Sequence, residues 1–126
     1  MNMQSDLGRV RGLGSAKEGT GHWWGQRVSA VALVPLSLWF IYAVVSLAGA
    51  GHGDYVQWIK QPATALMLVL LIGFTFYHMA LGLEAITEDY VHGPKTRVVT
   101  LVSIKLASLL LAVSGILSVL KTAFTG

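Results

Sequence analysis

Three long apolar segments constrain the fold of this chain more than any other feature of its sequence. They cover residues 28–50, 63–83 and 98–120, and the only lysine, arginine, aspartate or glutamate inside them is Lys105. Because an α-helix rises about 1.5 Å per residue, roughly 20 apolar residues cross the ~30 Å hydrocarbon core of a bilayer. The sequence therefore predicts an all-α integral membrane protein with three transmembrane helices.

The composition favours lipid over water as the surroundings of these helices. Hydrophobic residues make up 54% of the 126 residues and charged residues only 12%. A soluble domain of this size buries a small share of its chain and could not hide so much apolar surface. We expect one membrane domain at 27–126, with spans at about 28–50, 63–90 and 98–120. A polar, glycine-rich segment at 1–26 precedes it and has no apolar stretch typical of a cleavable signal peptide.

The absence of cysteine from the sequence excludes several classes of site. Disulfide scaffolds, iron–sulfur clusters held by thiolates and cysteine nucleophiles all require this residue. Any redox centre held by this chain must therefore use histidine or be organic. The net charge of +3 comes from a few basic residues beside apolar segments, which predicts contact with membrane lipid rather than with nucleic acid.

The basic residues outside the apolar segments predict how the chain crosses the membrane. Six of them lie before the first segment or between the second and third, whereas only Lys60 and Lys121 lie on the other side. Lysine and arginine accumulate on the cytoplasmic side of bacterial membrane proteins. We therefore expect a cytoplasmic N-terminus and a periplasmic C-terminus. Turns are expected between the helices, the first of them at Gly51, Gly53, Gln61 and Pro62.

His78 is the one histidine inside an apolar segment, near the middle of the second. An ionisable group at that depth is costly and is usually paired or ligated. Its position alone leaves open an axial haem ligand, a proton relay, a hydrogen bond to another helix and a lipid-facing residue. A six-coordinate haem needs two axial ligands. If His78 is one of them, the second must come from another chain.

Polar and small residues follow His78 toward the predicted cytoplasmic end of the second helix. Helical periodicity places Gly82, Ala85 and Asp89 on the same face as His78, which suits either a flat macrocycle or an ordinary seam of helix packing. Tyr90 could donate a hydrogen bond to a quinone carbonyl while Asp89 orients it or relays protons. The alternative is an interfacial tyrosine beside a solvated acid.

Arg27 precedes the first apolar segment and is expected at the same membrane face as Asp89 and Tyr90. A guanidinium there could pair with a haem propionate, a phospholipid phosphate or the carboxylate of Asp89. Glu84 and Lys105 should lie at similar depths in antiparallel helices, which predicts an ion pair between them. The alternative for Lys105 is that its long side chain reaches the headgroups alone.

The segment FYHMALGLEAITEDYVHGPKTR, residues 76–97, resembles the signature of the smaller hydrophobic membrane anchor of succinate dehydrogenase. The likeness consists of a histidine, a glycine four residues later, Asp-Tyr near the end of the helix and a basic loop. The segment RVSAVALVPLSLWF, which begins at Arg27, is similar to the alphaproteobacterial and mitochondrial-like form. Together with the three-helix topology, the resemblance extends over nearly the whole chain.

This resemblance implies a role for each candidate residue. His78 would be an axial ligand of haem b, with the other ligand on a larger cytochrome b anchor subunit. Tyr90 and Asp89 would contact ubiquinone, and Arg27 would lie near the quinone and the haem propionates. FAD and the iron–sulfur clusters would belong to a flavoprotein subunit and an iron–sulfur subunit, and the isolated chain would have no activity.

The same resemblance implies a multi-pass protein of the bacterial inner membrane. Two alternatives remain open at this point. One is an anchor of fumarate reductase or of another quinone-linked respiratory complex, and the other is a purely structural anchor without haem.

Overall fold

The computed structural model describes residues 17–125, which form four α-helices and no strand. The helices are α2 (Lys17–Ser46), α3 (His52–Lys60), α4 (Pro62–Tyr90) and α5 (Pro94–Thr125). Three of them contain apolar stretches long enough to cross a membrane, at Thr20–Ser46, Pro62–Tyr90 and Pro94–Thr125. The prediction of an all-α fold with three membrane-spanning helices is confirmed. Residues 1–16 of the predicted cytoplasmic segment at 1–26 lie outside the described residues.

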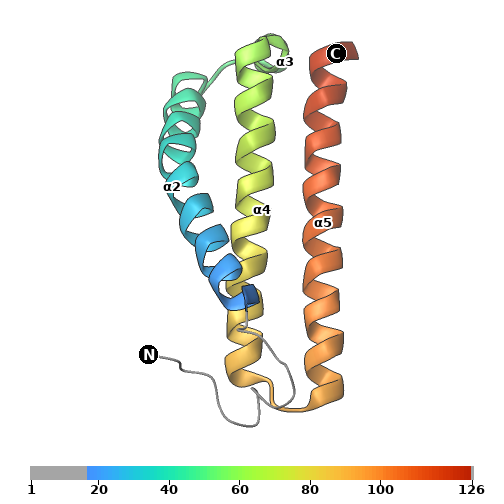
Figure 1. Ribbon diagram of the computed structural model, residues 1–126. Helices are drawn as coiled ribbons and strands as arrows, with labels where there is room; N and C mark the ends of the chain where they lie inside the picture. Colours follow the sequence, from blue (N-terminus) through green and yellow to red (C-terminus); the bar gives the residue numbers. More distant parts are fainter. Residues whose placement is uncertain (1–16, 126) are drawn as a thin grey trace.

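The helix α4 occupies the centre of the arrangement (Figure 1). Both α2 and α5 pack against α4, whereas the backbones of α2 and α5 stay apart from each other. The helix α5 runs antiparallel to α4 along its whole length, whereas α2 crosses α4 near its own N-terminal end and diverges from it toward α3 (Figure 1). The N-terminal half of α2 is therefore the part whose backbone comes closest to α4 (Figure 1).

Prolines start both α4 and α5, and a guanidinium holds the turn between these two helices. Pro62 and Pro94 stand in the first turn of α4 and α5, where a missing backbone N–H costs nothing. At the other end of α4, the Arg97 guanidinium donates hydrogen bonds to the carbonyl oxygens of Val91 at 3.0 and 3.1 Å and of Glu88 at 3.3 Å. These bonds satisfy acceptors that the end of the helix leaves free. They hold the turn that follows Tyr90.

The helix bounds differ from the expected spans mainly in α2. This helix begins at Lys17 rather than near residue 28, and it ends at Ser46 rather than near residue 50. Gly49 follows with a φ of 84°, a left-handed conformation that suits glycine and turns the chain away from α2. The polar residues of the segment 17–27 predict that it lies outside the membrane helix. In the structure this segment is helical and extends α2 alongside α4.

The loop between the first two spans contains a helix where the sequence predicted only a turn. The backbone N–H of Gly51 donates to the Asp54 carboxylate at 3.1 Å and starts α3. Trp58 stacks on Trp39 of α2 with ring centroids 5.9 Å apart. The Tyr55 hydroxyl donates to the carbonyl oxygen of Leu47 at 3.1 Å. These contacts with α2 and with the residue that follows it, together with packing on α4 and α5, stabilise a short helix that its own sequence does not predict.

Most of the buried residues between the helices are small or polar, and most of the large apolar side chains face outward. The buried residues are Ser29, Leu36, Ala43, Thr64, Leu68, Leu81, Glu84, Thr87 and Ser108. Many valines, leucines and isoleucines of all three long helices are exposed. This distribution is typical of membrane helices, whose apolar residues meet lipid or partner helices and whose small residues allow close packing.

Candidate functional site

The imidazole of His78 is held at the crossing of α2 and α4. Its Nδ1 lies 2.9 Å from the hydroxyl oxygen of Ser29, which belongs to α2. The side chain of Ser29 is completely buried, and its hydroxyl also donates to the carbonyl oxygen of Gln26 at 3.0 Å. The polar residue expected deep in the second span is thus hydrogen-bonded to a neighbouring helix, one of the roles that the sequence left open.

The other ring nitrogen of His78 remains available. Within the part of the chain that the structure describes, Nε2 makes no hydrogen bond, and it is not among the buried atoms that lack a partner. It therefore reaches the surface of the chain from a half-buried ring. An imidazole nitrogen placed in this way can bind a group that a second chain also contacts.

A glycine makes the crossing close enough for this hydrogen bond. A Cβ at Gly25 would overlap the hydroxyl of Tyr77 and would lie 3.4 Å from Cδ1 of Leu81. Gly25 is one helical turn before Ser29, so it lies on the same face of α2. The backbone of α2 can approach α4 at this point because the position carries no side chain.

One turn further toward the N-terminus of α2, His22 meets Glu84. Nε2 of His22 lies 3.7 Å from Oε2 of Glu84, and that nitrogen is buried without a hydrogen bond. The predicted ion pair between Glu84 and Lys105 is wrong, because these two groups are not within 4.0 Å of each other. The reason is the early start of α2, which brings His22 to the carboxylate that Lys105 was expected to neutralise.

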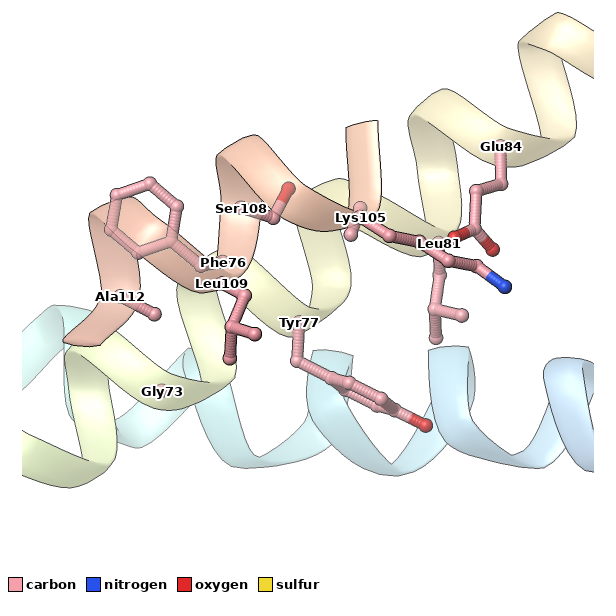
Figure 2. Close-up of a pocket in the computed structure, with 10 residues that line it drawn as sticks. Gly73, Phe76, Tyr77, Leu81, Glu84, Lys105, Ser108, Leu109 and Ala112 are labelled. Carbon is pink, nitrogen blue, oxygen red and sulfur yellow. The ribbon is translucent and has the colours of Figure 1, made fainter. Parts of the chain in front are cut away.

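Lys105 and Glu84 nevertheless share a cavity between α4 and α5 (Figure 2). Its volume is about 440 Å³. Its walls are mainly apolar, and the two charged side chains lie toward the same end of it (Figure 2). The lining residues are Gly73, Phe76, Tyr77, Ala80, Leu81, Glu84, Lys105, Ser108, Leu109 and Ala112. Such a space can accept a hydrocarbon chain.

The structure does not bring Arg27 together with Asp89 or Tyr90. Because His22 faces Glu84 and Ser29 faces His78, Arg27 is level with about Ala80, roughly 15 Å along α4 from Tyr90. Its exposed guanidinium lies 5.3 Å from the ring centroid of Trp23, a cation–π contact. Arg27 is therefore much closer in depth to His78 than to the end of α4.

Asp89 and Tyr90 lie exposed at the C-terminal end of α4. Tyr90 is 76% exposed, and neither side chain makes a hydrogen bond or an ion pair within residues 20–125. Twelve residues separate Tyr90 from His78, which is about 18 Å along the helix. Both groups are free to contact a partner chain or a ligand beyond the surface of this chain.

Ser29, Gly25 and His22 are site residues that the sequence reading did not single out. A signal for two of them is present, because Gly21, Gly25 and Ser29 recur at intervals of four residues. Small residues at this spacing mark a helix face that packs closely on another helix. No such pattern marks His22, whose partner depends on where α2 begins.

The described residues include no group of three histidine, cysteine or acidic side chains that could hold a metal ion. His78 can therefore supply only part of a metal's coordination from this chain. Any group that it ligates would need further ligands from its own structure or from another subunit.

Comparisons with known proteins agree on one kind of relative. A family model described as succinate dehydrogenase/fumarate reductase transmembrane subunit matches residues 1–118. The chain is 30% identical over 118 residues to a succinate dehydrogenase hydrophobic membrane anchor subunit of Rickettsia bellii, covering 94% of each chain. It is 34% identical over 84 residues to that of Paracoccus denitrificans, covering 67% of this chain and 65% of the relative. No solved structure matches the chain significantly.

Proposed function

The chain belongs to the succinate dehydrogenase/fumarate reductase transmembrane subunit family, and from this premise we propose that it binds haem b through His78 and helps to bind ubiquinone. It is a membrane anchor subunit of succinate dehydrogenase and a multi-pass membrane protein. The bacterial inner membrane fits its bacterial relatives. The complex to which it belongs is an oxidoreductase.

The observation that carries the haem proposal is the state of the His78 ring. One nitrogen is fixed by a buried hydroxyl of α2, and the other makes no hydrogen bond among the described residues. Imidazole nitrogen is an ordinary axial ligand of haem iron, and the ring fits that role here. When bound, a haem b would supply a centre that accepts and returns one electron.

The second axial ligand would come from a partner, the larger cytochrome b anchor subunit. His22 lies on α2, the helix that carries the hydrogen-bond partner of His78, but its Nε2 is buried against Glu84. His52 lies in α3 and His92 follows the end of α4, far along the chain from His78. A shared site between two anchor chains accounts for the surface position of Nε2.

Arg27 would act on the haem side rather than the quinone side of this arrangement. Its depth matches that of residues close to His78, and its guanidinium is exposed. A guanidinium forms strong paired hydrogen bonds with a carboxylate. We therefore assign Arg27 to a haem propionate rather than to Asp89, which lies at the far end of α4.

Tyr90 and Asp89 would form this chain's part of the ubiquinone site. The phenol of Tyr90 can donate a hydrogen bond to a quinone carbonyl, and the carboxylate of Asp89 can hold or pass a proton. Ubiquinone takes up two electrons and two protons when it is reduced. The electrons would arrive from the iron–sulfur subunit and the FAD of the flavoprotein subunit, docked on the predicted cytoplasmic side.

Two other functions fit the same family. An anchor of fumarate reductase would use the same helices, because the soluble subunits decide the direction of the reaction. A purely structural anchor would have no use for an unpartnered Nε2 at the chain surface. The hydrogen bond on Nδ1 fits both roles, so the haem spectrum described below is what separates them.

A spectrum of the complete complex tests the proposal. We expect the purified, co-expressed complex to give a b-type signal in its dithionite-reduced minus oxidised spectrum, and His78→Leu to lose or shift it. His52→Leu is the matched control, because His52 is an exposed histidine in α3. A signal that His78→Leu leaves unchanged would place the haem on partner chains alone and would overturn the assignment.

A further inference from the structure

We infer that Ser29 is the positioning residue of His78. Its hydroxyl accepts a hydrogen bond from the Nδ1–H of the imidazole and thereby turns Nε2 away from the helix pair. This inference rests on the proposed haem ligation and deepens it. It assigns a role to a buried residue of α2.

The assignment of the proton follows from counting hydrogens at Ser29. A hydroxyl has one hydrogen to donate and two lone pairs to accept with. The carbonyl oxygen of Gln26 has none to donate, so the 3.0 Å contact uses the hydrogen of Ser29. The 2.9 Å contact must then run from the N–H at Nδ1 of His78 to the oxygen of Ser29. In this tautomer Nε2 is an acceptor and therefore a possible ligand.

Burial makes this hydrogen bond decisive for the orientation of the ring. The Ser29 side chain has no exposed surface, so water cannot replace it as the partner of Nδ1. Leaving a buried N–H without a partner is costly. The alternative tautomer would also leave the hydroxyl and Nδ1 as two acceptors facing each other. The surroundings of Ser29 thus favour one orientation of the His78 ring, with a hydrogen on Nδ1.

The close approach at Gly25 is what makes this bond possible. The glycine lets α2 contact Tyr77 and Leu81 of α4 one turn before Ser29. A ligand histidine that donates from its second nitrogen is fixed in direction and becomes a stronger donor to the metal. Loss of the bond should therefore raise the midpoint potential of the haem and change the geometry of its axial ligand.

The test compares Ser29→Ala with Ser46→Ala in the complete, co-expressed complex. Ser46 is the matched control, because it also lies in α2 but its hydroxyl donates only within that helix, to the carbonyl oxygen of Tyr42 at 2.8 Å. The readouts are the low-temperature paramagnetic resonance spectrum of the oxidised haem and its redox titration. We expect Ser29→Ala to change the g-values and raise the midpoint potential, and Ser46→Ala to match the wild type.

The outcomes separate this inference from the proposed function. A Ser29→Ala complex with wild-type g-values and potential would overturn the positioning role while His78→Leu still lost the signal. A signal that survives His78→Leu would instead overturn the ligand assignment itself. If Ser29→Ala does not assemble, Ser29→Cys keeps the size of the side chain with a weaker hydrogen bond and must show the same shifts. Failure of both to assemble, beside an intact Ser46→Ala complex, would show a role in folding alone and overturn the inference.

Discussion

Nε2 of His22 lies 3.7 Å from the carboxylate of Glu84 and joins α2 to α4 within the apolar part of the protein. The side chain of Glu84 is 12% exposed and that of His22 is 30% exposed, so water screens this pair only in part. If His22 is removed, the Glu84 carboxylate loses the one ion-pair partner that it has among the described side chains. The two helices should therefore depend on both groups together.

A double-mutant cycle on His22→Ala and Glu84→Gln should show this dependence. We expect each single substitution to lower the melting temperature of the detergent-solubilised complex, and the double variant to lose less than the two losses added. Groups in direct contact typically show a coupling free energy of about 0.5–3 kcal/mol. Glu88→Gln is the control, because Glu88 is exposed one turn further along α4. Losses that simply add would mean that the two groups do not interact.

Gly25→Ala should weaken the packing of α2 on α4. The added Cβ would overlap the Tyr77 hydroxyl, so the helices must separate or Tyr77 must move. Overpacking of this kind typically costs about 1–3 kcal/mol. Gly21→Ala is the matched control one turn earlier, where a Cβ would meet nothing within 4 Å. The measurement is the melting temperature of the co-expressed complex, and equal stability of the two variants would contradict the close crossing.

Lys105→Met should be tolerated. Lys105 is exposed and is not within 4.0 Å of Glu84, so removal of its charge leaves no buried carboxylate unpaired. Surface substitutions of this kind usually change stability by less than about 0.5 kcal/mol. The yield and melting temperature of the assembled complex measure the effect. A loss as large as that of Glu84→Gln, together with rescue of Lys105→Glu by Glu84→Lys, would restore the ion pair that the sequence predicted.

The sequence alone predicts those parts of the fold that depend on the properties of a single helix. The length and apolarity of each span are local properties, and they predicted the three long helices. The start of α2 was missed because the glycines and charged residues of 17–27 argue against a helix until contacts with α4 are known. The helix α3 was missed for the same reason, since Trp58 gains its partner Trp39 only in the folded chain.

The same distinction between single helices and contacts between helices applies to the candidate site. His78 stands out from the sequence because an isolated polar residue in an apolar span demands an explanation. Its partner Ser29 does not, because a serine in a membrane helix is common and its neighbour depends on how two helices cross. The separation of Arg27 from Asp89 also follows from that crossing. Relations between helices, rather than properties of one helix, are what the structure adds.

Tyr90→Phe should slow quinone reduction while the reduction of an artificial dye by succinate continues. The substitution removes one hydroxyl from a side chain that is 76% exposed, so it does not disturb the packing of α4. Loss of one hydrogen bond to the substrate, worth about 0.5–1.5 kcal/mol, should lower the quinone-dependent rate about 2- to 12-fold. Tyr42→Phe is the control, because Tyr42 is 75% exposed on α2 and lies far along that helix from its crossing with α4. Both activities should be measured on the same membranes. If they fell together in Tyr90→Phe, the defect would lie in assembly, and Tyr90 would have no specific part in the quinone site.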